Sequence, residues 1–251
     1  MIEGLAALGE LAAPVLVQAF AVFLRVGGLM LLLPGLGDRL IPARVKLVAA
    51  FALTAAVAPS VAAPAAVTPG LVAVELTIGV AFGAVLRFVA MALTMAGMMA
   101  AQLTSLAQLF GNVEPSSAVG NLLNLAGLAL LMASGLPLMV VDVMIRSYDV
   151  LPQGVVPVGA DMAAWGVRRV AGAFALAFGL AAPFALAALI YNAAMGVINR
   201  AMPQLMVALV GAPAITGASG VLLFLAAPLI LTVWKAAMVA ALGDPIGGGL
   251  P

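Results

Sequence analysis

Long hydrophobic stretches alternate along the chain with short polar breaks or breaks rich in proline and glycine. A helix needs about 20 apolar residues to cross the ~30 Å hydrocarbon layer of a membrane. Six stretches are candidate hydrophobic helices: about Leu11 to Leu33, Ala43 to Ala58, Pro69 to Met99 or as far as Leu109, Asn121 to Val143, Gly166 to Arg200, and Gly217 to Leu242. The pattern therefore predicts an all-α membrane protein with about six hydrophobic helices, which form a single multi-span membrane domain over residues 1–251.

Several of these helices are predicted to be kinked or too long for a simple span. Extended to Leu109, the third stretch would measure about 60 Å, so it must tilt steeply, project from the membrane or break. Pro137 and Pro183 lie inside the fourth and fifth stretches, where proline bends a helix. Arg146 to Trp165 is interpreted as a connector because it contains several turn formers, and about 243–251 as a disordered tail.

The composition supports a membrane protein and removes several functional classes. Hydrophobic residues make up 66% of the chain and charged residues 8%, whereas soluble domains have about 25% charged residues. The chain has no Cys and no His, which excludes disulfides, thiolate nucleophiles, His-based catalytic pairs and ordinary zinc or haem sites. A net charge of +1 gives no broad basic face for nucleic acid. We therefore expect no enzyme, no cofactor, no metal site and no nucleic-acid partner.

The start of the chain and its loops give two further indications. Glu3 and Glu10 precede Arg25, the first basic residue, which is the wrong pattern for a cleaved signal peptide. The first hydrophobic stretch is therefore expected to belong to the mature protein. Lys and Arg are divided equally between the two sets of loops, so the positive-inside rule gives no orientation.

Three ionisable residues lie within the apolar stretches, namely Arg25, Glu75 and Arg87. A charge in the hydrocarbon costs roughly 2.5–3.5 kcal/mol, so such residues usually face a protein interface or a water-filled path. Glu75 and Arg87 would lie about 18 Å apart along one helix and cannot pair directly within it. Each is expected to find its partner on another helix or subunit. The alternative, open above all for Glu75, is a charge at a helix end that reaches the membrane interface.

Two patterns in the third stretch concern packing. Met91, Met95 and Met98 share one helix face. Because methionine repacks easily, this face is a candidate for a compliant pore or packing surface, with ordinary core filling as the alternative. Gly79 and Gly83 form a GxxxG pair, which lets membrane helices approach closely.

Four regions resemble the FliR/SctT family, the export-gate proteins of bacterial type III secretion. They are residues 24–47 (LRVGGLMLLLPGLGDRLIPARVKL), the opening of the third stretch with Glu75 and Gly79, the loop Phe110 to Gly120 with its Glu114-Pro115 pair, and residues 182–205 (APFALAALIYNAAMGVINRAMPQL) with Arg200. The resemblance extends from about Val15 to Val239.

This resemblance implies a component of the flagellar export gate in the bacterial inner membrane, at the flagellar basal body. Members of the family join FliP-like and FliQ-like subunits, with an FlhB-like switch protein, in a helical assembly. Their helices pack as bent hairpins around a pore, within membrane lipid, and unfolded flagellar proteins cross through that pore. The buried charges Arg25, Glu75, Arg87 and Arg200 would then serve assembly.

By its position, the loop of residues 110–120 would plug the pore. The candidate plug residues are Phe110, Gly111, Asn112, Val113, Glu114 and Pro115. Phe110 and Val113 provide apolar bulk, and Gly111 provides conformational freedom. A plain surface turn is the alternative interpretation of the same residues.

Two other functions stay open. One is an injectisome export-gate subunit of the same family. The other is a small-molecule membrane transporter or channel, although transporters often contain internal repeats and none is visible in this sequence. An intramembrane enzyme is nearly excluded because the chain lacks His and Cys.

Overall fold

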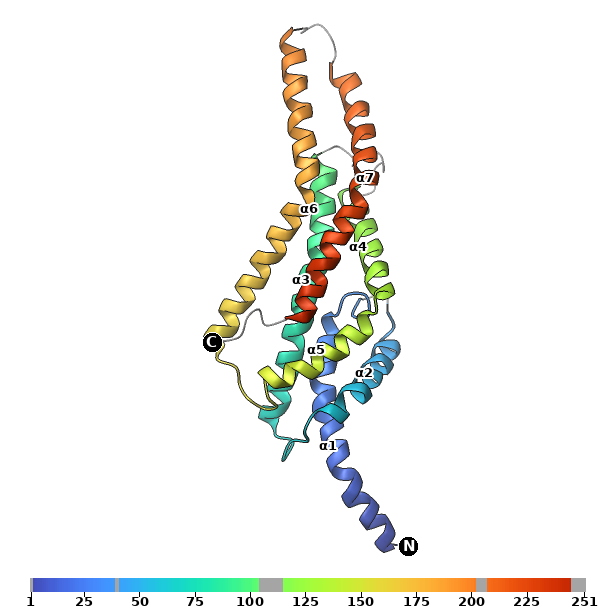
Figure 1. The fold of residues 1–251 in the computed structure, drawn as a ribbon, viewed down its shortest axis with the longest axis vertical. Coiled ribbons are helices and arrows are strands. Elements are labelled where there is room, and N and C mark those ends of the chain that lie inside the picture. Colours follow the sequence, from blue (N-terminus) through green and yellow to red (C-terminus); the bar gives the residue numbers. More distant parts are fainter. Residues whose placement is uncertain (1, 39–40, 104–114, 202–206, 245–251) are drawn as a thin grey trace. The chain divides into compact units, whose positions relative to one another are not determined.

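The structure, a computed structural model, describes residues 2–38, 41–103, 115–201 and 207–244. Within these residues the chain forms helices and no strand (Figure 1). The helices are α1 (Ile2–Leu32), α2 (Ala43–Val57), the 3-10 helix η1 (Ala58–Ser60), α3 (Pro69–Leu103), α4 (Pro115–Ala133), α5 (Leu136–Val150), α6 (Gly159–Ala201) and α7 (Val207–Gly243). The predicted all-α fold is confirmed.

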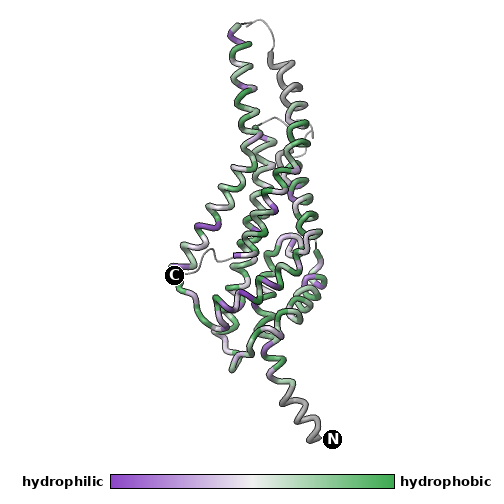
Figure 2. Tube along the Cα trace, viewed as in Figure 1, coloured by the Kyte–Doolittle hydropathy of each residue, from purple (hydrophilic) through white to green (hydrophobic). Residues whose placement is uncertain are grey.

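Hydrophobic residues cover most of the length of these helices (Figure 2). In the described part of the chain, five segments are long and apolar enough to cross a membrane: Ala12–Leu32, Ala43–Ser60, Pro69–Leu103, Gly159–Ala201 and Gly217–Gly243. The pair α4–α5 would make a sixth span, bent by 73°. The prediction of about six hydrophobic helices is confirmed.

The break between α4 and α5 lies at Gly135. Its φ is +85°, in the left-handed region that favours glycine. Pro137 follows in the first turn of α5, where its missing N–H costs no helical hydrogen bond. The proline therefore starts a new helix, whereas the sequence predicted a kink within one helix.

The predicted connector from Arg146 to Trp165 is wrong at both ends. Helix α5 continues to Val150 and α6 begins at Gly159, so the connection is residues 151–158. The buried face of α5 continues at helical spacing past the predicted boundary, from Val143 to Ser147.

Four helices are longer than a membrane requires, since α1 has 31 residues and α7 has 37, and α3 and α6 are long as well. Helix α3 has 35 residues and α6 has 43, which correspond to about 52 Å and about 64 Å. Both exceed the ~30 Å hydrocarbon layer, as predicted for the third stretch. Pro183 lies inside α6 without ending it.

The chain forms two compact units. Unit 1 comprises the described residues of Met1–Phe88, Met132–Arg169 and Val239–Pro251, and unit 2 those of Val89–Leu131 and Val170–Met238. Helices α3 and α6 each contribute to both units. The single multi-span domain stays a prediction, and the predicted tail lies mostly outside the described residues.

Helices α1 and α3 meet in unit 1 along a seam of glycines. A Cβ added to Gly79 would lie 2.0 Å from the Arg25 carbonyl oxygen. A Cβ on Gly28 or Gly83 would lie 2.6 Å or 2.7 Å from a backbone oxygen of the facing helix. Only glycine fits at such distances, so the two backbones are in direct contact, as small-residue faces allow in membrane helices.

Helix α2 packs beside α1 and α5 in the same unit. The Phe23 and Phe51 rings stack with centroids 4.9 Å apart, which joins α1 to α2. The Gln18 side chain on α1 donates hydrogen bonds to the carbonyl oxygens of Ala58 and Val61. The end of α2 and the start of the next connection are thereby fixed on α1.

Unit 2 is held together by small residues and one tryptophan. A Cβ on Gly97 of α3 would lie 2.5 Å from the Gly120 Cα of α4, so these helices also touch through their backbones. The Trp234 ring of α7 is fully buried against Gly127, and its Nε1 donates to the Val89 carbonyl oxygen at 2.8 Å. Helix α7 also lies beside α6, with a cavity of about 320 Å³ between them.

Replacing Gly79 with alanine tests the α1–α3 seam. We expect Gly79→Ala to lower the free energy of unfolding by about 1–3 kcal/mol, because the added methyl group must push the helices apart. Chemical unfolding of the purified chain in detergent measures this. Gly27→Ala is the matched control, since nothing lies within 4 Å of the added Cβ there. Equal stability of the two variants would contradict the close contact.

Candidate functional site

The most prominent polar site in unit 1 is a buried ion pair between α1 and α3. The side chains of Arg25 and Glu75 are both 0% exposed. Arg25 Nε donates to Glu75 Oε2 at 2.7 Å, and Nη2 donates to Oε1 at 3.1 Å. This bidentate geometry is the strongest form of an arginine–carboxylate contact.

The guanidinium of Arg25 also joins helix α5. Nη1 donates to Ser147 Oγ at 2.9 Å, and Nη2 donates to the Leu151 carbonyl oxygen at 2.9 Å. Ser147 Oγ in turn donates to the Met144 carbonyl oxygen. The Tyr148 ring covers the guanidinium, with its centroid 3.7 Å from Arg25 Cζ, which is a cation–π contact. The Arg25 side chain thus joins α1 to α3 and α5.

Glu75 fixes the connection between α5 and α6. Its Oε1 accepts a second hydrogen bond from the Gly154 N–H, at 3.1 Å. Gly154 has a φ of +72°, a conformation that favours glycine. The carboxylate therefore receives hydrogen bonds from both a helix and a loop.

Helical periodicity explains why these charges face inward. On α1, Arg25 shares a face with the buried Val22 and Leu29. On α3, Glu75 shares a face with the buried Leu71 and Ile78. Gly79 follows Glu75 by one turn and rests against the backbone of Arg25 itself, so the seam brings the two side chains within reach.

The chemistry of this cluster is structural. Both charges are fully buried and hydrogen-bonded, so neither is free to act on a substrate. Within the described residues, no three His, Cys, Asp or Glu side chains gather where they could hold a metal ion. The cluster clamps three helices together.

The other predicted charges lie nearer the surface. Arg87 forms an ion pair with Asp38 of the α1–α2 connection, and the Arg87 side chain is 41% exposed. Arg200 is exposed in the last turn of α6. Its role in assembly, like that of Arg87, stays a prediction.

The methionine face belongs to the part of α3 in unit 2. Met91 is 47% exposed, and Met95 and Met98 are partly exposed. The chain therefore leaves this face partly uncovered, and its role in a pore stays a prediction. Of the predicted plug, Phe110 to Glu114 lie outside the described residues, and Pro115 is the first residue of α4.

Sequence reasoning missed the α5 side of the clamp, namely Ser147, Tyr148, Leu151 and Gly154. These residues fell in the stretch interpreted as a connector. The missed signal is the helical spacing of buried residues on α5, which runs from Leu136 through Val140 to Ser147.

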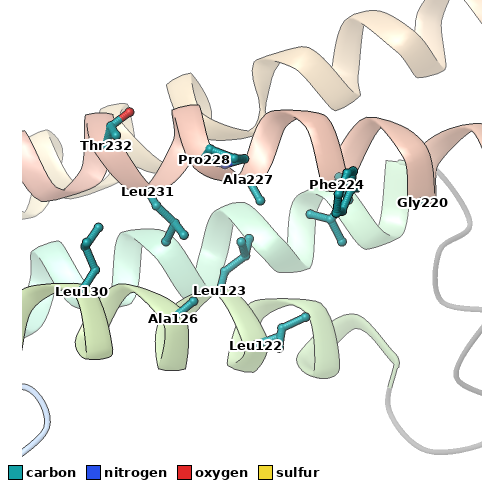
Figure 3. Close-up of a pocket in the computed structure, with 11 residues that line it drawn as sticks. Leu122, Leu123, Ala126, Leu130, Gly220, Phe224, Ala227, Pro228, Leu231 and Thr232 are labelled. Carbon is teal, nitrogen blue, oxygen red and sulfur yellow. The ribbon is translucent and has the colours of Figure 1, made fainter.

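Unit 2 contains an apolar groove of about 670 Å³ between α4 and α7 (Figure 3). Leu122 and Ala126 come from α4, and Phe224 and Leu231 come from α7. The one side-chain hydroxyl in the lining, on Thr232, donates to the Leu229 carbonyl oxygen. The groove offers apolar surface and no group for chemistry.

Two comparisons with known proteins identify relatives of the chain. The family described as Bacterial export proteins, family 1, matches residues 16–241. A protein named flagellar biosynthetic protein FliR, from Caulobacter vibrioides, is 36% identical over 207 residues, which are 78% of this chain and 82% of that relative.

Breaking the buried pair on one side leaves an uncompensated charge. Arg25→Leu and Glu75→Leu are each expected to lower the free energy of unfolding by about 3–5 kcal/mol. The double variant should lose less than the sum of the two, because no lone charge remains buried. Chemical unfolding of all four proteins in detergent measures this coupling.

Arg87→Leu is the control for that cycle. Its ion pair with Asp38 is partly exposed, so the expected loss is at most about 1 kcal/mol. Strict additivity of the Arg25 and Glu75 variants would show that the pair contributes nothing as a unit.

Proposed function

Because the chain belongs to the bacterial export proteins of family 1, we propose that it is a component of the flagellar type III protein export gate. The observation that carries this proposal is the 36% identity to a flagellar biosynthetic protein over 78% of the chain. The name of that relative favours a flagellar gate over an injectisome gate. Such a gate conducts protein and requires no catalytic group, so we propose no enzymatic activity.

The fold supports a membrane location. Five helices of the described chain, and a bent pair that would make a sixth, are apolar enough to span a bilayer. The buried charges of Arg25 and Glu75 satisfy each other and do not meet lipid. We place the protein in the bacterial inner membrane at the flagellar basal body.

The exposed surface supports an assembly with other hydrophobic subunits. Large apolar side chains such as Phe178, Leu189 and Phe224 are more than half exposed in the single chain. Faces of this kind contact lipid or other helices in a membrane. We propose FliP-like and FliQ-like chains as the partners, an FlhB-like switch protein beside them, and unfolded flagellar proteins as the cargo in transit.

The helices that flank the proposed plug support its position. Residues 104–114 connect α3 to α4. The backbone contact between Gly97 and Gly120 holds those two helices together. A loop that leaves and returns at a fixed pair of helices suits a plug, because its base stays in place while the loop yields to a passing chain.

Deleting the plug tests the gate. We expect removal of residues 110–116 to make the assembled gate conduct ions, since the pore would lose its closing segment. Conductance across planar bilayers that contain the purified complex measures this. Removal of residues 245–251, which also takes out seven residues, is the matched control. An unchanged conductance after the first deletion would contradict the plug.

Native mass spectrometry tests the assembly itself. A tagged copy expressed with its genomic neighbours should be recovered in one large complex with FliP-like and FliQ-like chains. Recovery as a stable monomer or homodimer would contradict the proposal and favour the small-molecule transporter.

A further inference from the structure

Unit 1 contains a cleft of about 660 Å³ at the ends of its helices, a size typical of binding sites. One wall is the connection between η1 and α3, from Ser60 to Thr68. The other wall is the end of α5 with the residues after it, from Ile145 to Gln153. The cleft thus lies where helices end and other molecules can approach.

The first wall exposes unpaired backbone. Residues 62–67 form neither helix nor strand, and their backbone makes no hydrogen bond to other backbone groups within the described residues. Ala63 and Ala65 in this wall are exposed. Free N–H and C=O groups beside a cleft can pair with the backbone of a second extended chain.

The second wall contains two polar atoms that make no hydrogen bond of ordinary geometry within the described chain, namely Tyr148 Oη and Gln153 Nε2. The two side chains lie close to each other. An unsatisfied buried polar atom costs about 1–3 kcal/mol, which favours a bound molecule that supplies a partner. The wall is therefore suited to a ligand with both donors and acceptors, as a peptide backbone has.

The charge of the cleft favours a positively charged ligand. Asp149 is the one charged residue among its described lining, and it is exposed. It has no ion-pair partner within the described chain, and the guanidinium of nearby Arg146 is held by Asp142. A lone carboxylate attracts Lys or Arg and repels the phosphate of a lipid headgroup.

We propose that this cleft binds an extended, positively charged segment of a partner subunit of the gate. The proposal rests on the proposed function, because it requires an assembly. The backbone of the partner segment forms hydrogen bonds with the Gln153 amide and with the backbone of residues 62–67. A Lys or Arg of the segment forms an ion pair with Asp149. A carboxylate and hydrogen-bonding groups that lie together in one cleft favour one sequence, whereas a conduit for varied cargo must release every segment. These features support a subunit contact over a cargo contact.

Tyr148 couples the cleft to the buried ion pair. The same ring that lines the cleft covers the guanidinium of Arg25. A segment bound in the cleft therefore holds Tyr148 in place against the clamp. Docking of the partner is expected to stabilise the contacts between α1, α3 and α5.

Photocrosslinking in the intact complex tests the proposal. A benzophenone amino acid replaces Ala63 in the chain expressed with its genomic neighbours, and mass spectrometry maps the product. We expect a crosslink to one partner subunit, close to a Lys or Arg. Asp149→Asn should lower its yield about two- to fivefold, the scale of one partly exposed ion pair. Asp161→Asn, which lies in the first turn of α6 outside the cleft lining, should leave it unchanged.

A charge exchange completes the test. Asp149→Lys combined with Asp at the mapped partner residue should restore the crosslink that Asp149→Lys alone removes. If Asp149→Asn reduces recovery of the complex, a second variant replaces it. Ala63→Trp fills the cleft without a change of charge, and the benzophenone probe is moved to Ala65. Ala63→Trp should abolish the crosslink from that probe.

Three results would overturn the inference: crosslinks to lipid alone, crosslinks to exported cargo alone, or partner crosslinks that are insensitive to Asp149. If the complex is intact and any of these results is obtained, only the proposed binding role of the cleft is refuted. Failure of the unmodified chain to join FliP-like and FliQ-like subunits refutes the gate itself.

Discussion

The buried pair of Arg25 and Glu75 is the interaction on which unit 1 depends. Removing two charges from water costs several kcal/mol per ion, and an incompletely bonded pair does not recover that cost. Here five hydrogen bonds surround the pair, from α3, α5 and the loop that follows α5. Because these bonds require one relative position of the helices, the pair sets the register of α1, α3 and α5. Hydrophobic side chains would pack with far less directional constraint.

The glycine seam is the condition for that pair. Gly79 brings the α3 backbone against the carbonyl of Arg25 itself, which leaves no gap for lipid or a side chain between the helices. Unit 2 has no comparable buried ion pair among its described residues. Its helices are positioned by the Gly97–Gly120 contact and by Trp234. Apolar burial alone does not draw helices together inside a membrane. The chain therefore holds its helices together by a buried ion pair in unit 1 and by close backbone contact and a tryptophan in unit 2.

Much of this fold can be predicted from the sequence, because apolar length and Pro/Gly breaks specify membrane helices locally. The sequence does not predict which residue pairs with Arg25. Its partner lies 50 residues away, and local periodicity carries no information on which helices touch. The connector error had a local cause. Asp142, Arg146 and Asp149 are exposed on α5, and these charges hide the regular buried spacing that ends at Ser147. The sequence predicts a bend at Pro137, where proline removes a helical hydrogen bond, whereas the left-handed conformation of Gly135 breaks the helix two residues earlier.

The sequence separation within the clamp has a consequence for biosynthesis. Arg25 emerges from the ribosome 50 residues before Glu75 and 122 residues before Ser147. At roughly 5–20 residues per second, the arginine waits about 3–10 seconds for its carboxylate. During that interval the unpaired charge makes insertion of the first helix less favourable by roughly 2.5–3.5 kcal/mol. Insertion of the third helix then supplies the carboxylate that removes this cost.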